Sequence, residues 1–87
     1  MENVIVFGAG LSGLGAKELL EKKGFNVFLV DDKTGISSND GIKIINEKKI
    51  EFIIKSPGIP WEAELLQVAK EKKIKVMSEI DLAYRYL

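Results

Sequence analysis

Residues 4–13 read Val-Ile-Val-Phe-Gly-Ala-Gly-Leu-Ser-Gly. Apolar residues followed by closely spaced glycines are typical of a buried strand that turns sharply into a helix. In this pattern Gly8 permits the turn, Gly10 lets a ligand approach the backbone, and Gly13 lets the helix lie close to the strand. The first turn of such a helix has unpaired N–H groups and a partial positive charge. The stretch therefore predicts a binding site for the diphosphate of a nucleotide.

Two features outside the glycines support this interpretation. Apolar residues recur with helical spacing after Gly13, and Asp31 follows the next apolar run, 18 residues beyond Gly13. An acidic residue at the end of the second strand of such a unit commonly accepts hydrogen bonds from a ribose or a base. Glycines also form ordinary turns, so a purely structural turn remains the alternative.

The composition indicates one small domain and excludes several kinds of chemistry. The 87 residues include 13 basic and 13 acidic side chains, no histidine and no cysteine. A balanced charge without basic blocks argues against nucleic-acid binding. Because thiols and imidazoles are missing, we expect no disulfide and no metal site. We recognise neither a secretory nor a membrane-spanning segment, so we expect a cytoplasmic protein without membrane contact.

The tripeptide Glu-Lys-Lys occurs three times, at residues 21–23, 47–49 and 71–73, and a strand-like run follows each copy. Basic residues suit the negative end of a helix dipole, so each copy indicates a helix that ends and turns into a strand. The chain therefore predicts an α/β, Rossmann-like three-layer domain over residues 1–87. We expect a four-stranded parallel sheet in the order 2-1-3-4 with helices on both faces.

The first two helices are marked with different clarity. The first is expected over residues 12–23, because Gly24 suits the position just after a helix. The second is expected over residues 39–48 with Ser38 as its N-cap. Gly41 inside this helix costs about 1 kcal/mol relative to alanine, so Ile42–Ile45 also fits a short edge strand.

The third helix is expected directly after Pro60, which is a good residue for a first helical turn. Trp61 is then expected to pack in the core against Leu65 rather than to offer a stacking surface to a base. The last helix is expected to begin at Ser78-Glu79-Ile80-Asp81, which resembles a capping box.

The strand order places a second loop beside the glycine turn. Ligands of such sheets bind at the carboxyl ends of the strands where the strand order reverses, here between strands one and three. Strand three ends in Ser56-Pro57-Gly58-Ile59-Pro60, so this loop faces the glycine turn. The prolines stiffen it, and the Ser56 hydroxyl and the Gly58 amide suit a second contact with a diphosphate. A rigid turn between strand and helix is the alternative.

The other candidates lie at the head of the first helix and after the second strand. The N–H groups of Leu11 and Ser12 and the Ser12 hydroxyl are expected phosphate donors, unless Ser12 only caps its own helix. Asp31 and Asp32 either accept hydrogen bonds from the ligand or form a turn, and Lys33 either flanks a base or is solvated. No catalytic group and no Gly-x-x-x-x-Gly-Lys-Ser/Thr run is evident. The chain alone is therefore expected to bind and not to catalyse.

Four features together resemble the N-terminal domain of the D-glutamate-adding enzymes of the Mur ligase family: residues 8–15, Asp31, residues 56–60 and residues 78–85. The resemblance extends over essentially the whole chain. It implies a ligase of peptidoglycan precursor synthesis that uses ATP and magnesium to join D-glutamate to UDP-MurNAc-L-alanine through an acyl phosphate. It further implies that this chain is the UDP-binding fragment of that ligase, and that separate central and C-terminal domains bind ATP and the amino acid.

By this resemblance, the head of the first helix contacts the diphosphate, the acidic turn surrounds the uracil, and the third-strand loop completes the site. The residues expected to bind UDP are Gly10, Leu11, Ser12, Gly13, Asp31, Asp32, Lys33, Ser56, Pro57 and Gly58. Two features depart from the family. Lys33 stands where many relatives carry Arg, which has a planar fork of donors. The stretch between the second strand and Glu51 is also shorter than the family pattern.

Two other classes of protein share the glycine turn and the acid after the second strand. One is an NAD-binding regulatory module, and the other is the cofactor domain of an oxidoreductase. The NAD module has no reason to carry Ser56-Pro57-Gly58 at the end of the third strand. The glycine motif taken alone favours the oxidoreductase domain, whereas the four features together favour the ligase interpretation.

Overall fold

The computed structural model describes the backbone of residues 1–86 and their side chains except those of residues 11, 12 and 86. Strands and helices alternate along the described chain, and the strands form one parallel sheet in the order β2-β1-β3-β4. This confirms the predicted α/β, Rossmann-like arrangement. The elements are β1 (Asn3–Phe7), α1 (Leu11–Lys22), β2 (Asn26–Val30), α2 (Ser38–Glu47), β3 (Ile50–Lys55), α3 (Glu64–Glu71), β4 (Lys75–Ser78) and α4 (Glu79–Tyr86).

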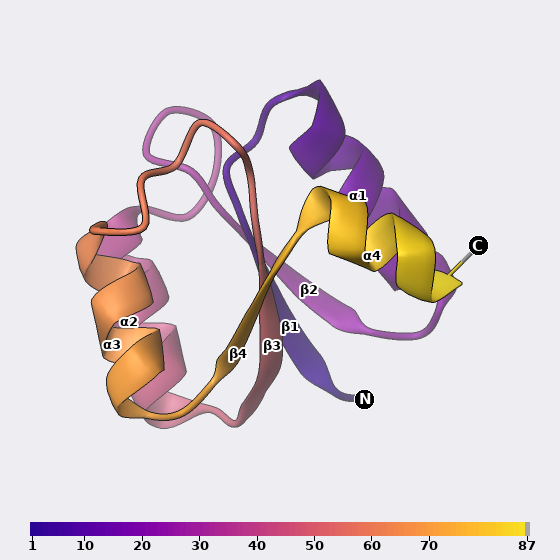
Figure 1. Ribbon diagram of the computed structural model, residues 1–87. Coiled ribbons are helices and arrows are strands. Elements are labelled where there is room, and N and C mark those ends of the chain that lie inside the picture. Colours follow the sequence, from indigo (N-terminus) through magenta and orange to yellow (C-terminus); the bar gives the residue numbers. More distant parts are fainter. Residues whose placement is uncertain (87) are drawn as a thin grey trace.

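The sheet separates two apolar clusters. Figure 1 shows α1 and α4 over one face and α2 and α3 over the other. Side chains of β1 alternate between the faces: Val4 and Val6 are buried on the α1 side, and Ile5 and Phe7 on the α2 side. Because β1 lies between β2 and β3 and is covered on both faces, its sequence is a continuous apolar run rather than an alternating one.

Each Glu-Lys-Lys copy lies at the end of a helix, as predicted, and two of these ends share one geometry. After α1, Gly24 has a φ of 91°, and its N–H donates to the Glu21 carbonyl. After α3, Lys73 has a φ of 60°, and its N–H donates to the Lys70 carbonyl. In both cases the N–H of the following residue bonds back into the last turn, which is the Schellman arrangement. Glycine adopts this left-handed conformation without steric cost, whereas lysine does not.

Lys73→Gly is therefore expected to raise the free energy of unfolding by about 0.5–1 kcal/mol. Relief of the left-handed strain exceeds the extra chain entropy that glycine loses on folding. Chemical denaturation followed by circular dichroism measures this change. Lys72→Gly is the matched control: it removes the same charge, but Lys72 has a φ of −89°, so it should lower stability. Equal effects of both changes would contradict the explanation.

The start of α2 differs from the prediction by one residue. Ser37 is the N-cap, and its hydroxyl accepts a hydrogen bond from the Asp40 N–H at 3.1 Å. The prediction of Ser38 was wrong because Ser38 is already helical and its side chain bonds to Asp32 instead. Residues 42–45 belong to the helix, so the edge-strand alternative is also wrong. A Cβ at Gly41 would lie 2.8 Å from a Leu65 methyl group, so this glycine allows α2 to pack closely on its neighbours.

Two predictions for the segment before α3 were wrong. The helix begins at Glu64 with Ala63 as N-cap, and not directly after Pro60, whose carbonyl instead accepts the Ala63 N–H in a turn. Trp61 belongs to this turn and is 57% exposed, so it is not a core residue. By contrast, the capping box of α4 is confirmed. The Asp81 carboxylate accepts the Ser78 N–H, and the Ser78 hydroxyl accepts the Asp81 N–H.

Candidate functional site

The glycine turn connects β1 to α1 at the carboxyl edge of the sheet, where the loops after β1, β2 and β3 gather (Figure 1). The Gly8 N–H donates to the Val30 carbonyl at 2.9 Å, and Gly8 has a φ of 109°. A Cβ at Gly8 would lie 2.5 Å from Ser56 Oγ. Gly8 thus permits both the turn and the approach of the third-strand loop, and the predicted convergence of the two loops is confirmed.

Gly13 allows α1 to lie against the turn. A Cβ there would overlap the Gly8 carbonyl oxygen, so even one methyl group does not fit. Gly10 has a different environment. It is the N-cap of α1 with a φ of −66° and a ψ of −177°, and a Cβ there would have no heavy atom within 4 Å. The space in front of the first turn is therefore open to a ligand.

The first turn of α1 provides hydrogen-bond donors at this edge. The first N–H groups of a helix have no partner within the helix, and Gly10 has no side chain with which to cap them. The first turn also contains no acidic residue, so the positive end of the helix dipole is not neutralised locally. The predicted roles of the Leu11 and Ser12 side chains fall outside the described side chains.

Asp31 organises the edge from the end of β2. Its Oδ2 accepts the Ala9 N–H at 2.8 Å, and its Oδ1 accepts the N–H groups of Lys33 at 2.9 Å and Thr34 at 3.2 Å. The Ala9 bond, followed by the Lys33 bond, holds the pKa of this carboxyl below its ordinary value of 3.8. Asp31 thus joins the glycine turn to the loop after β2, and backbone donors occupy most of its acceptor capacity.

The low pKa of Asp31 predicts that the domain loses stability in acid. The folded pKa lies below the unfolded value, so this carboxylate stabilises the fold fully above pH 3.8. The contribution is lost as the pH falls through the folded pKa. The stability of Asp31→Asn should depend less on pH below 4, and the carboxyl carbon of Asp31 should titrate below 3.8 by NMR. A carboxyl that titrates above this value would contradict the assignment.

Asp32 and Lys33 lie farther from the glycine turn. The Asp32 carboxylate accepts the Ser38 N–H at 2.7 Å and the Ser38 hydroxyl at 3.0 Å, so it anchors the start of α2. The Lys33 side chain is exposed. The turn that the sequence offered as an alternative for both aspartates is present, and it places Lys33 at its outer edge.

Ser56 connects three parts of the edge. Its N–H donates to the Phe7 carbonyl at 3.0 Å. Its Oγ lies 3.2 Å from the Gly8 carbonyl and 3.0 Å from Glu79 Oε1. Both of these oxygens are acceptors, whereas a hydroxyl has one proton, so the hydroxyl donates to one of them at a time. The Gly8 carbonyl and the Glu79 carboxylate therefore compete for the Ser56 hydroxyl proton.

A cavity of about 350 Å³ opens between these loops. Among the predicted residues, Gly10, Asp31, Ser56, Pro57 and Gly58 line it, while Gly13, Asp32 and Lys33 do not. Among the described side chains, its lining is Gly8, Ala9, Gly10, Asp31, Ser56, Pro57, Gly58, Ile59 and Glu79. The volume lies in the range of small-ligand sites.

Four lining residues were not predicted as site residues: Gly8, Ala9, Ile59 and Glu79. Glu79 is the charged one among them. The capping box correctly indicated a helix start at Ser78, but it was interpreted only as a helix signal. The available clue was the position: the residue follows the fourth parallel strand, whose carboxyl end lies at the same edge as the glycine turn. An acidic residue directly after that strand was therefore a site candidate.

Other kinds of site find no support in the part of the chain that is described. No group of three or more acidic side chains there is arranged to hold a metal ion. None of its buried polar side-chain atoms lacks a hydrogen-bond partner. No helix among the described residues has the length and apolar character needed to cross a membrane.

Comparison with known proteins identifies relatives over the whole length of the chain. All 87 residues match the UDP-N-acetylmuramoylalanine–D-glutamate ligase of Fusobacterium nucleatum with 42% identity. The resemblance to the Mur ligase family is confirmed. Ligases of the same name from Cytophaga hutchinsonii and Bacillus mycoides are 34% and 35% identical over 99% and 95% of the chain. No protein-family model matches the chain.

The chain corresponds to only a part of these ligases. It spans 19% of the Fusobacterium ligase and 22% of each of the other two, as expected for one domain of a larger enzyme. The Cytophaga alignment extends over 101 positions, more than the chain contains, whereas the Fusobacterium alignment extends over 87. The chain is thus shorter than the corresponding segment of the Cytophaga ligase, whereas the corresponding Fusobacterium segment is not longer than the chain. An NAD module and an oxidoreductase domain are not favoured by these matches.

Proposed function

We propose that this chain binds the UDP part of UDP-MurNAc-L-alanine. In this proposal it is the N-terminal domain, over residues 1–87, of a cytoplasmic ligase that adds D-glutamate to that substrate. As the family resemblance implies, ATP and magnesium serve the catalytic step in the remainder of the ligase. The isolated chain is then a binding domain without activity.

One observation carries the proposal. Gly10, the N-cap of α1, and the loop Ser56–Gly58 line the same cavity of about 350 Å³. A helix N-terminus provides N–H donors and positive potential for a diphosphate. Gly10 and Gly58 leave open space next to their backbones, so a phosphate oxygen can approach the amides directly.

The uridine is assigned to the β2 side of the cavity. Asp31 lines the cavity there and holds the Ala9 N–H and the Lys33 N–H in place. We assign Asp31 mainly to positioning the glycine turn. Asp32 and Lys33 do not line the cavity, and we assign them to the loop beyond it that reaches the uracil. Lys33 offers a point charge instead of a planar guanidinium, so its contact with the base is expected to be weak.

The proposal is tested by NMR titration of the chain with UDP, NAD and FAD. UDP should shift the amide signals of Leu11–Gly13, Asp31–Lys33, Ser56 and Gly58. The dissociation constant is expected on the order of 0.1–10 mM, or about −3 to −5 kcal/mol, because the other substrate contacts belong to the remainder of the ligase. NAD binding without UDP binding would overturn the proposal.

Glu79→Gln is expected to lower the dissociation constant for UDP about three-fold. The Glu79 carboxylate lines the cavity and competes for the Ser56 hydroxyl, and its charge repels a diphosphate across a partly screened distance. Glutamine keeps an acceptor oxygen for that hydroxyl but carries no charge. The same NMR titration measures the change.

Glu62→Gln is the matched control for this prediction. Glu62 is exposed and does not line the cavity, so its change should leave UDP binding unaltered. Equal gains in both variants would indicate a general charge effect. Weaker binding by Glu79→Gln would mean that the carboxylate itself contacts the ligand.

A further inference from the structure

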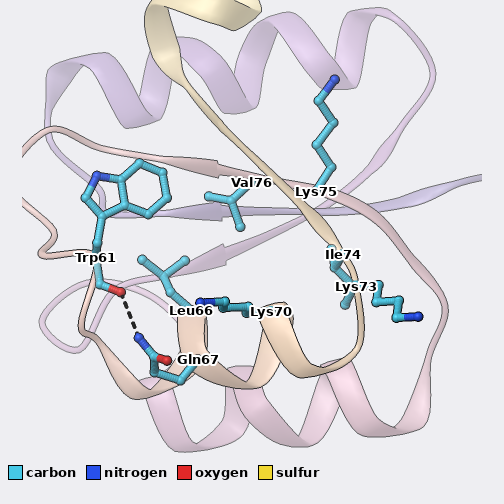
Figure 2. A pocket seen from close by; sticks show the side chains of 8 residues that line it. All are labelled: Trp61, Leu66, Gln67, Lys70, Lys73, Ile74, Lys75 and Val76. Carbon is cyan, nitrogen blue, oxygen red and sulfur yellow. Dashed lines mark hydrogen bonds between the residues drawn. The ribbon is translucent and has the colours of Figure 1, made fainter.

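A second cavity lies away from the glycine turn, between α3, the edge strand β4 and the turn before α3 (Figure 2). Its volume is about 500 Å³. It shares no lining residue with the cavity at the glycine turn, and the proposed binding of UDP does not use it. Its lining has three chemically different parts: an aromatic wall, an aliphatic floor and a basic rim.

The aromatic wall is Trp61, whose side chain faces the cavity (Figure 2). The ring is 57% exposed and yet held in place. Lys55 Nζ lies 4.9 Å from the ring centroid, and the Gln67 side-chain amide donates to the Trp61 carbonyl at 3.3 Å. Lys55 is itself only 7% exposed, and its Nζ donates to the Ser56 carbonyl at 3.0 Å. A fixed, exposed indole loses little entropy when a ligand stacks on it.

The floor is apolar. Leu66 is 4% exposed, and Ile74 and Val76 are partly buried and pack against the same cluster. These side chains and Trp61 line the same cavity and offer it apolar surfaces. The two surfaces together suit a flat aromatic group.

The rim is basic. Lys70, Lys73 and Lys75 line the cavity, and no acidic side chain does. The ion pairs found among the described residues involve none of these three ammonium groups. An anionic group at the rim can therefore bind these ammonium groups without breaking an existing ion pair.

The neighbouring surface extends the same charge. A second hollow shares Lys73 and Ile74 with this cavity and adds Lys48, Lys49 and Lys72. Its acidic member, Glu51, lies 3.5 Å from the Lys49 ammonium and is already paired. The chain carries no net charge, so this accumulation is local.

We propose that the cavity binds a small anion that carries an aromatic ring. The ring stacks on Trp61 above Leu66 and Val76, and the carboxylate, sulfonate or phosphate of the ligand lies among Lys70, Lys73 and Lys75. The aromatic ring and the negative charge are both required, because the wall and the rim contribute separately.

The test uses 1-naphthoate as the probe. Trp61 is the single tryptophan of the chain, so its indole N–H signal in NMR reports on this cavity. Naphthoate should shift that signal saturably, together with the amides of Leu66 and Val76, with a dissociation constant on the order of 1 mM. Naphthalenemethanol, which lacks the charge, and cyclohexanecarboxylate, which lacks the aromatic ring, should each bind at least five-fold more weakly.

Variants separate the two contributions. Trp61→Leu, followed through the Leu66 and Val76 amides, should weaken naphthoate binding at least five-fold, because aromatic stacking is lost. Lys70→Gln and Lys75→Gln should each weaken it two- to five-fold. Lys43→Gln is the matched control, since Lys43 does not line the cavity, and it should change nothing.

Three outcomes would overturn the proposal. The first is no saturable shift of the indole signal up to 20 mM naphthoate, on the order of twenty times the expected constant. The second is equal binding of naphthoate and naphthalenemethanol, which would mean a merely apolar surface. The third is a set of shifts centred on Gly8 and Gly10, which would place the probe in the other cavity.

Discussion

Gly13→Ala is expected to lower the free energy of unfolding by about 2 kcal/mol. The added methyl group would overlap the Gly8 carbonyl oxygen, which belongs to the backbone and has no rotamer through which to move away. Overpacking of this kind costs about 3 kcal/mol, and the better helix propensity of alanine returns up to about 1 kcal/mol. Denaturation with urea, followed by circular dichroism, measures the difference.

Gly15→Ala provides the matched control for this change. Gly15 lies in the same helix, and a Cβ there would have no heavy atom within 4 Å. Helix propensity alone then acts, and stability should rise by about 0.5–1 kcal/mol. The two alanines should thus act in opposite directions. Stabilisation by Gly13→Ala would mean that α1 does not depend on close approach to the turn.

Gly10→Val is expected to raise the dissociation constant for UDP at least ten-fold while the domain stays folded. Gly10 has an extended backbone that valine also adopts, and the space around its Cβ position is empty. The cost to the fold is limited to about 1 kcal/mol for a poorer N-cap. The valine side chain would instead fill the space through which a phosphate reaches the first amides of α1.

A graded series sharpens this prediction. Gly10→Ala should weaken UDP binding less than Gly10→Val, because its side chain fills less of the same space. Gly15→Ala should leave UDP binding unchanged, since Gly15 does not line the cavity. NMR titration with UDP measures binding, and circular dichroism verifies the fold. An unchanged UDP response in Gly10→Val would show that the diphosphate does not approach the backbone there.

Local signals predicted most of the fold. The apolar run in β1, the three Glu-Lys-Lys copies at the helix ends and the capping box at Ser78 were each sufficient to place an element. These signals act over a few residues, through backbone hydrogen bonds and side-chain periodicity, so one sequence contains them fully. The strand order followed because right-handed crossovers leave few arrangements of alternating strands and helices.

The errors arose where two chemically similar signals compete. Ser37 and Ser38 are both good N-caps, and the contact of Ser38 with Asp32, six residues away, decides between them. Pro60 suits a first helical turn and a loop equally well. In the structure it lies between two turns, one closed by the Ile59 N–H on the Ser56 carbonyl and one closed by the Ala63 N–H on the Pro60 carbonyl. Trp61 was expected to pack against Leu65 in a helix that starts after Pro60, but it lies in the turn before α3, with Lys55 Nζ 4.9 Å from its ring centroid.

The sequence alone thus specified an α/β domain with a glycine turn at a strand end, because periodicity, caps and backbone freedom are properties of neighbouring residues. The composition of the cavity depended on tertiary structure. Asp31 reaches Ala9 across 22 residues, and Ser56 reaches Gly8 across 48 and Glu79 across 23. Such contacts form only when parallel strands bring their carboxyl ends to one edge, so no local pattern could show that Asp31 holds the turn or that Glu79 shares the donor of Ser56.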